Sequence, residues 1–128
     1  MAKKRILIID DEEDIRDYLR EILEDSGFEV VDAANGLSGQ KLFRQKPTDL
    51  IITDILMPEK GGFEAILELH REFPEVKIFA ISGGGRVSSE VYLEVAKDLG
   101  AIRTFAKPVN AKELIAEISN LFQTEGDD

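Results

Sequence analysis

The chain has 128 residues, which suits a single domain with one buried core. It contains no cysteine, which excludes disulfides and thiolate chemistry and is compatible with a cytoplasmic location. Its formal net charge of −10 argues against direct DNA binding, because a phosphate backbone attracts clustered lysine and arginine. The apolar run 6–9 after the basic start is far too short for export or membrane insertion.

Short apolar runs rich in β-branched residues alternate with amphipathic segments along the chain. The apolar runs predict strands, and the amphipathic segments predict helices with one apolar face. In chain order we expect a strand over 5–9, a helix over 12–25, a strand over 28–33, a helix over 36–45, a strand over 50–53, a helix over 63–73, a strand over 76–81, a helix over 88–99, a strand over 101–105 and a helix over 111–122. Gly27 and Gly100 stand where two of these helices should end.

This alternation predicts a (βα)5 domain of the α/β class. Strands buried on both faces read as continuous apolar runs, as residues 6–9 and 50–52 do, so the sheet should be parallel. Right-handed crossovers then place helices on both faces, which gives a doubly wound three-layer sandwich. We expect one domain over residues 1–123, a short acidic tail over 124–128 and no second domain.

Polar residues stand at the ends of four predicted strands. They are Asp10, Asp11 and Glu12 after the first strand, Asp54 after the third, Ser82 and Gly83 after the fourth, and Lys107 and Pro108 after the fifth. Ligands of doubly wound sheets bind outside the carboxyl ends of the strands. We therefore expect these residues to form one site at that edge.

The chemistry of this set favours a metal and a phosphoryl group. The carboxylates of Asp10, Asp11 and Asp54 would repel one another unless a hard divalent cation such as Mg²⁺ lay between them. Mg²⁺ takes one or two carboxylates together with phosphate oxygens, which suits an open site that handles phosphate. Lys107 and Ser82 could hold phosphoryl oxygens, and an aspartate carboxylate can accept phosphate covalently.

These motifs resemble the receiver domains of response regulators in two-component signalling. The resemblance rests on Asp10-Asp11-Glu12, Thr53-Asp54 followed by Met57-Pro58, Ser82-Gly83 and Lys107-Pro108, in this order and spacing, and it covers essentially the whole chain. It implies a CheY-like fold with a five-stranded parallel sheet in the order 2-1-3-4-5. It also implies that Asp54 is the phosphoryl acceptor.

The resemblance implies a role for each remaining site residue. Asp11 would bind Mg²⁺ directly and Asp10 mainly through water, while Asp54 and the backbone carbonyl of Leu56 would complete the protein ligands. The Lys107 ammonium and the Ser82 hydroxyl would contact the phosphoryl group, as would the backbone N–H groups of Gly83 and Leu56. The Lys107–Pro108 peptide bond would be cis.

The resemblance also implies a signalling switch, and not an enzyme that turns over an external substrate. The phosphoryl group would come from a sensor histidine kinase or a histidine phosphotransfer protein. Its charge would change the face formed by the fourth helix, fifth strand and fifth helix. That face would bind an unknown protein target, or the chain would relay the phosphoryl group onward.

Three residues near these motifs have plainer interpretations. Glu12 is expected to be a favourable first-turn helix acid and not a metal ligand. His70, the only histidine of the sequence, lies among charged residues of a helix and is expected at the surface. Ile15 is either a core residue or an exposed contact for a partner.

The sequence departs from the receiver pattern at two places. Thr104 stands where family members commonly carry an aromatic residue that responds to phosphorylation, and Phe105 beside it should be buried on the alternating strand. The stretch from Ser82 to Lys107 is longer than in a typical receiver, and its glycines at 83–85 make the loop permissive. We expect small residues here to let the backbone close over the phosphoryl group, while the aromatic response is in doubt.

Two other functions fit these residues less well. A small Mg²⁺-dependent phosphohydrolase with Asp54 as nucleophile would need, in the haloacid-dehalogenase pattern, an aspartate two residues later, where Leu56 stands. A flavodoxin-like electron carrier would need a phosphate-binding loop after the first strand, where this chain has acids.

Overall fold

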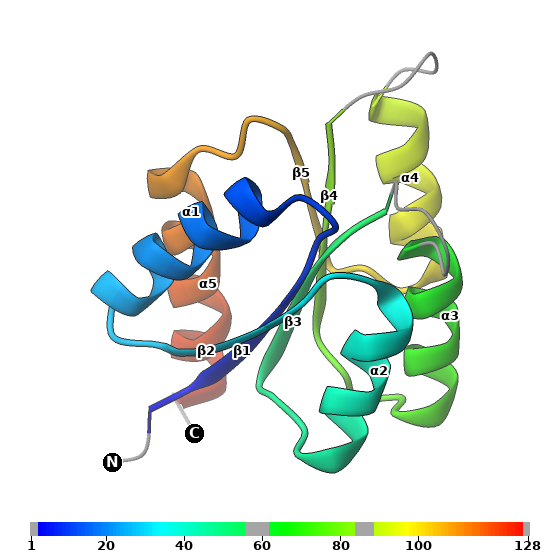
Figure 1. The fold of residues 1–128 in the computed structure, drawn as a ribbon, viewed down its shortest axis with the longest axis horizontal. Coiled ribbons are helices and arrows are strands. Elements are labelled where there is room, and N and C mark those ends of the chain that lie inside the picture. Colours follow the sequence, from blue (N-terminus) through cyan, green and yellow to red (C-terminus); the bar gives the residue numbers. More distant parts are fainter. Residues whose placement is uncertain (1–2, 56–61, 84–88, 127–128) are drawn as a thin grey trace.

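The computed structural model describes residues 3–55, 62–83 and 89–126. Over these residues five strands alternate with five helices, as predicted (Figure 1). The elements are β1 (Arg5–Ile9), α1 (Glu13–Asp25), β2 (Glu29–Ala33), α2 (Gly36–Gln45), β3 (Leu50–Asp54), α3 (Gly62–Glu72), β4 (Ile78–Ser82), α4 (Ser89–Leu99), β5 (Arg103–Ala106) and α5 (Ala111–Gly126). Within the described ranges, no helix is long and apolar enough to cross a lipid bilayer.

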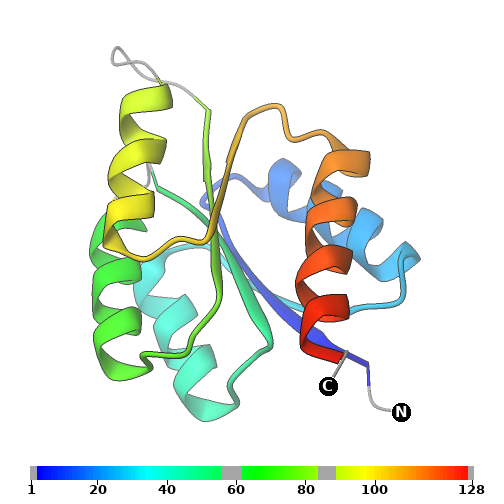
Figure 2. The same cartoon turned by 180° about the vertical axis from the view of Figure 1, so that it is seen from behind.

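The strands form one parallel sheet in the order β2-β1-β3-β4-β5. The register places Ile6 of β1 opposite Val30 of β2 and Leu50 of β3. Helices α1 and α5 cover one face of the sheet, and α2, α3 and α4 cover the other, as Figures 1 and 2 show from opposite sides. The predicted three-layer sandwich and the implied strand order are confirmed.

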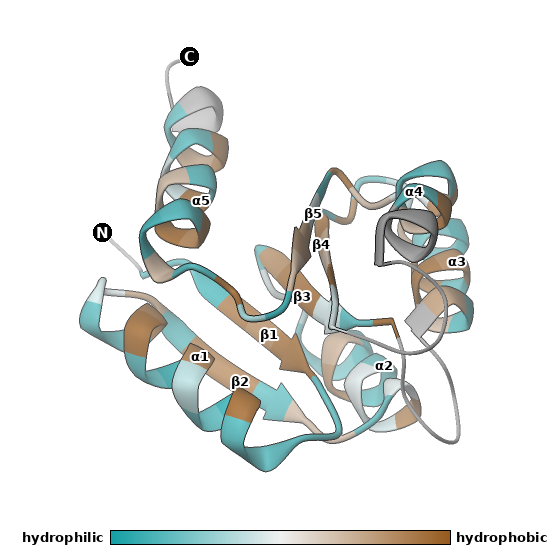
Figure 3. Ribbon diagram, turned by 90° about the horizontal axis from the view of Figure 1, so that it is seen from above, coloured by the Kyte–Doolittle hydropathy of each residue, from teal (hydrophilic) through white to brown (hydrophobic). Residues whose placement is uncertain are grey.

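The core consists of two apolar clusters, one on each face of the sheet. Successive side chains of a strand point to opposite faces. Ile6 and Ile8 therefore pack in the cluster beneath α1 and α5, whereas Leu7 and Ile9 pack in the cluster beneath α2, α3 and α4. All four side chains are fully buried, and Figure 3 shows the hydrophobic colour along β1. This burial on both faces explains the continuous apolar run in the sequence.

Both ends of β1 and α2 fall where predicted, whereas each other element differs from its prediction by one to four residues at one or both ends. β4 begins at Ile78 and β5 at Arg103, each two residues later than predicted, because Ile78 is the first residue to pair with β3 and Arg103 the first to pair with β4. Helix α5 runs to Gly126, four residues beyond its predicted end at 122, since the polar residues after 122 include no helix breaker before the glycine. The predicted domain end at 123 therefore falls inside α5.

Tertiary contacts decide the placement of Ile15 and His70. Ile15 is half-buried and packs against the cluster beneath α1 and α5, which favours its interpretation as a core residue. His70 is half-buried, so it lies at the surface only in part, and its ring makes a packing contact that was not predicted. Its ring packs against Gly100, where a Cβ would lie 3.1 Å from Cγ of His70. The charged neighbours of His70 in sequence gave no sign of this contact between α3 and the end of α4.

Helix α2 packs closely on β1 at Gly39. This glycine is buried, and a Cβ at its position would overlap Cδ1 and lie 2.7 Å from Cγ1 of the fully buried Ile9. Close approach of the helix to the strand therefore requires glycine here, although alanine has the higher helix propensity by about 1 kcal/mol.

We expect Gly39→Ala to lower the free energy of unfolding by about 1–3 kcal/mol, because overpacking outweighs the gain in helix propensity. Ile9→Val, which removes Cδ1, should recover part of this loss in the double variant. Urea unfolding of the wild type, both single variants and the double variant gives the coupling energy between the two sites. Simple additivity, or a Gly39→Ala protein more stable than the wild type, would contradict this packing account.

Candidate functional site

Residues from four strand ends meet at the carboxyl edge of the sheet, as predicted. Asp10 directly follows β1, and Lys107 directly follows β5. Asp54 is the last residue of β3, and Ser82 is the last residue of β4. Because β4 pairs with both β3 and β5, these ends lie next to one another in space.

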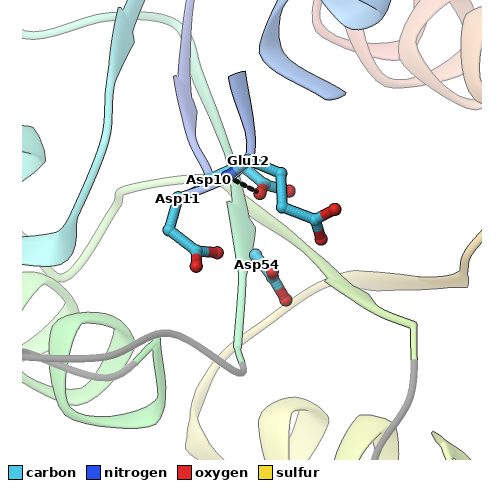
Figure 4. Close-up of side chains that lie close together, drawn as sticks. All are labelled: Asp10, Asp11, Glu12 and Asp54. Atoms are coloured by element: carbon cyan, nitrogen blue, oxygen red, sulfur yellow. Dashed lines mark hydrogen bonds between the residues drawn. The ribbon is translucent and has the colours of Figure 1, made fainter. Parts of the chain in front are cut away.

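Four carboxylates gather at the ends of β1 and β3 (Figure 4). They belong to Asp10, Asp11, Glu12 and Asp54, and one oxygen of each lies within 4.8 Å of the corresponding oxygens of the others. Asp10 and Asp54 are buried, whereas Asp11 and Glu12 are exposed. The site therefore has a buried floor and an open, acidic rim.

Glu12 faces this site and does not cap helix α1. It occupies the N-cap position, but its side chain makes no capping hydrogen bond. Its Oε1 accepts a hydrogen bond from Nζ of Lys107 at 3.1 Å. This contact places the Glu12 carboxylate beside the site as well as at the start of α1, which the expectation of a first-turn helix acid did not include. That Glu12 is not a metal ligand stays a prediction.

Asp10 is fixed by its own backbone and by its neighbour. Its N–H donates to the carbonyl of Ala33 at 3.1 Å, which ties the end of β1 to the end of β2. Its Oδ1 accepts from the N–H of Glu12 at 2.8 Å, the bond drawn in Figure 4. These bonds hold the carboxylate, which belongs to a residue only 1% exposed, in one orientation toward the site.

The Lys107 ammonium lies among three of the carboxylates. Nζ is 3.0 Å from Oδ2 of Asp54 and 3.1 Å from oxygens of both Asp10 and Glu12. The contact with Asp10 is an ion pair without hydrogen-bond geometry, since Oδ2 of Asp10 forms no hydrogen bond within the described parts of the chain. Four carboxylates and one ammonium leave a formal excess of three negative charges.

The charge balance shifts two pKa values. Burial raises the pKa of Asp10, and the nearby charge of Asp54 adds to this, against the opposing effects of the Glu12 N–H and of Lys107. Burial by itself would lower the pKa of Lys107, but hydrogen bonds to Asp54 and Glu12, together with attraction from the carboxylates around the ammonium, outweigh it and raise that pKa. Lys107 therefore stays protonated, whereas ionisation of Asp10 is disfavoured.

The aliphatic part of Lys107 lies across the backbone of Gly83. A Cβ on Gly83 would come within 2.7 Å of Cβ and 2.9 Å of Cγ of Lys107. A larger residue would displace the lysine stem, so glycine here lets the ammonium reach the carboxylates. The Lys107–Pro108 peptide bond is cis, as the family resemblance implied.

Ser82 lies fully buried beside Lys107. Its Oγ forms no hydrogen bond with any residue that the structure describes, and its carbonyl accepts from the N–H of Lys107 at 2.9 Å. Thr104 is half-buried, while Phe105 is buried in the core against Phe79, as predicted. The predicted contributions of Leu56 and of loop residues 84–86 lie outside the described residues.

Two residues that sequence reasoning did not connect with the site contact its backbone. Nη1 of Arg16 donates to the carbonyl of Asp10 at 2.7 Å, and Oη of Tyr18 donates to the carbonyl of Val109 at 3.1 Å. Arg16 lies one helical turn after Glu12, and its N–H bonds to the Glu12 carbonyl. That spacing was the available signal, because residues four apart share a helix face.

The fold is that of solved receiver domains. A response regulator receiver domain protein (CheY-like) from Methanospirillum hungatei JF-1 matches with a TM-score of 0.86 and 31% sequence identity, over 99% of this chain and 100% of that chain. A response regulator receiver domain protein from Clostridium thermocellum matches with a TM-score of 0.86 and 29% identity, over 96% of this chain and 97% of that one. The molecule is thus a CheY-like α/β protein with an acidic site.

Sequence comparison places the chain in a family. Residues 6–119 match the model of the response regulator receiver domain, so the chain belongs to that family. The response regulator receiver protein CpdR of Brucella abortus (strain 2308) is 31% identical over 118 residues, which cover 92% of this chain and 96% of CpdR. The probable transcriptional regulator ycf27 of Cyanophora paradoxa is 34% identical over 121 residues, and this chain spans 49% of its length.

The acidic cluster fits a hard divalent cation. All four groups offer oxygen, the ligand that Mg²⁺ and Ca²⁺ prefer. The excess negative charge and the Oδ2 atom of Asp10, which lacks a hydrogen bond within the described residues, both favour a cation at this position. The residues present therefore constitute an acidic metal-binding site of the kind that the receiver resemblance implied.

The raised pKa of Asp10 leads to a prediction about how the free energy of unfolding depends on pH. A carboxylate whose pKa is raised by folding lowers the free energy of unfolding at pH values above that pKa. We expect Asp10→Asn to be more stable than the wild type at pH 7 in the presence of a chelator, because the amide keeps an acceptor oxygen for the Glu12 N–H without a buried charge. The difference should shrink as the pH falls through the raised pKa of Asp10 and disappear below the ordinary pKa of an unfolded aspartate, where Asp10 is neutral in both the folded and the unfolded chain.

Urea unfolding at several pH values measures this difference. The control is Asp17→Asn at an exposed position of α1, which should stay within about 0.5 kcal/mol of the wild type throughout. An Asp10→Asn protein less stable than the wild type at neutral pH would show that Lys107 more than compensates the buried carboxylate.

Proposed function

We propose that this chain is a phosphorylation switch in which Asp54 accepts a phosphoryl group from a phosphohistidine. The observation that carries the proposal is the position of Asp54 at the end of β3, 3.0 Å from the Lys107 ammonium and inside a cluster of further carboxylates. A sensor histidine kinase or a histidine phosphotransfer protein would supply the group, as membership of the receiver family suggests.

The carboxylates of Asp10, Asp11 and Asp54, with the backbone carbonyl of Leu56, would hold Mg²⁺. When bound, Mg²⁺ would neutralise charge on the phosphoryl oxygens and on the carboxylates that surround them. Without such charge compensation, a phosphoryl group would be repelled from a site with an excess of negative charge.

Transfer would form a P–O bond to a carboxylate oxygen of Asp54 as the P–N bond of the donor breaks, and the departing imidazole would take up a proton. The Lys107 ammonium would move from Asp54 to a phosphoryl oxygen. The Ser82 hydroxyl, which lacks a hydrogen bond within the described residues, would donate to another oxygen. The N–H groups of Gly83 and Leu56 would hold the remaining oxygens.

The chain would reset itself by hydrolysis. Water would attack the phosphorus of the aspartyl phosphate, release inorganic phosphate and restore the Asp54 carboxylate. This activity acts on the chain's own side chain, so we propose a regulator and not an enzyme with an external substrate.

The output would be a change in the face formed by α4, β5 and α5. Phosphorylation adds a charge of about −1.5 to −2, which would draw the Ser82 hydroxyl and the Lys107 ammonium toward the oxygens of the phosphoryl group on Asp54. Ser82 pairs with Ala106, the residue before Lys107, so this movement would act directly on the ends of β4 and β5. Thr104 supplies no aromatic ring, and the strand ends themselves would therefore transmit the change.

The surface beside Lys107 suits the phosphoryl donor. A pocket of about 350 Å³ is lined by Ile15, Tyr18, Lys107, Pro108 and Val109. Apolar contacts with this pocket would place a donor histidine next to the site. We propose that the switch acts on other proteins, either as a regulator of a target protein or as a relay intermediate that passes the phosphoryl group onward.

Incubation with Mg²⁺ and a small acyl phosphate, followed by intact-mass measurement, tests the acceptor. The wild type should gain the mass of one phosphoryl group, and Asp54→Asn should gain none, because the amide is not a nucleophile for phosphorus. Asp17→Asn is the matched control and should be labelled like the wild type. An unlabelled wild type, or equal labelling of Asp54→Asn, would refute the proposed function.

A further inference from the structure

Arg16 of helix α1 connects the acidic turn to strand β2. Its Nη1 donates to the backbone carbonyl of Asp10 at 2.7 Å, and its Nε donates to Oδ2 of Asp32 at 3.1 Å. The side chain is only 16% exposed, so these bonds are partly shielded from water. One guanidinium thus spans from the end of β1 to a carboxylate on β2.

Asp32 is itself held by a second arginine. Nη2 of Arg20 donates to Oδ1 of Asp32 at 2.8 Å, and Nη1 of Arg20 donates to the carbonyl of Val30 at 3.1 Å. The hydrogen bond with Asp32 is the main reason why the pKa of Arg20 is raised. Each arginine thus engages a different oxygen of Asp32, and the bond between Oδ2 and Nε anchors the Arg16 side chain to β2 without involving Arg20.

The carbonyl that Arg16 holds belongs to the peptide group leading into Asp11. A peptide group is planar, so fixing the Asp10 carbonyl also fixes the N–H and the Cα position of Asp11. The rest of Asp10 is tied by its N–H to Ala33 and by Oδ1 to the N–H of Glu12. Asp11 is exposed, and its carboxylate therefore depends for its position on the backbone that carries it.

We propose that Arg16 is a positioning residue that presets the Asp10 and Asp11 carboxylates for a divalent cation. The proposal rests on the metal site of the proposed function. Arg16 acts through the peptide between the two aspartates and does not touch the cation. Its planar group donates from Nε and Nη1 to two separate acceptors, whereas the compact ammonium of lysine cannot bridge both in the same way.

The test is the affinity of the unphosphorylated chain for Mg²⁺, measured by isothermal titration calorimetry. Arg16→Met keeps the apolar stem and should raise the dissociation constant about tenfold, as loss of a residue that orients metal ligands commonly does. Arg16→Lys keeps the charge but not the bridge and should raise it by a similar factor. Wild-type affinity in Arg16→Lys would mean that charge alone matters and would overturn the proposal.

Arg20→Met is the matched control. It removes another guanidinium from Asp32 but leaves the contact between Arg16 and Asp10 in place. Its Mg²⁺ dissociation constant should stay within about twofold of the wild type, even if urea unfolding shows a loss of stability like that of Arg16→Met. Equal weakening of Mg²⁺ binding in Arg16→Met and Arg20→Met would show general destabilisation and overturn the proposal.

Labelling with the acyl phosphate separates this inference from the proposed function. Arg16→Met should be labelled slowly at low Mg²⁺ and at nearly the wild-type rate at saturating Mg²⁺, because its defect lies in binding the cation. Weaker Mg²⁺ binding in Arg16→Met with no labelling of the wild type would refute the function and support the positioning role. Unchanged Mg²⁺ binding in Arg16→Met together with normal labelling of the wild type would support the function and refute the positioning role.

If Arg16→Met does not fold, Asp32→Asn provides a second test, because it loosens the anchor of Arg16. This variant should bind Mg²⁺ several-fold more weakly than the wild type, and unchanged binding would overturn the proposal.

Discussion

Four carboxylates share one edge of the sheet with the Lys107 ammonium, and their mutual repulsion is the constraint on which the site depends. Two like charges 4 Å apart repel by about 4 kcal/mol in a partly screened protein environment. Lys107 contacts three of the groups and relieves only part of this repulsion, because one ammonium faces four carboxylates. Under the proposed function a phosphoryl group would add further negative charge, so its entry would require a cation that offsets the repulsion.

The carboxylates stay close together despite this repulsion because the backbone that carries them is fixed. β1 and β3 are buried on both faces, and their apolar side chains anchor the ends that carry Asp10 and Asp54. The N–H of Asp10 donates to the carbonyl of Ala33 and the carbonyl of Asp10 accepts from Arg16, while Gly83 leaves room for the Lys107 stem. The mutually repelling carboxylates are thus held together by a core whose stability comes from the burial of apolar side chains.

The sequence predicted the order of the elements and the edge of the sheet that carries the site, because parallel strands bring their carboxyl ends together. It did not predict contacts between residues distant in sequence. The turn of Glu12 toward Lys107 and the packing of His70 on Gly100 both depend on such contacts. The hydrogen bond from Arg16 to Asp32 was not predicted for the same reason. Strand ends were off by up to two residues, since pairing and not hydropathy decides where a strand starts.

Family membership, the acidic cluster and the lysine beside Asp54 support one account, in which a covalent phosphoryl group on a single aspartate changes the charge of the sheet edge. The most direct test is chemical trapping of that group. Borohydride reduction after treatment with an acyl phosphate and Mg²⁺ converts an aspartyl phosphate to homoserine, which peptide mass spectrometry can locate. The account predicts homoserine at position 54 in the wild type. Homoserine at another aspartate, or phosphate retained on a hydroxyl such as that of Ser82, would contradict it.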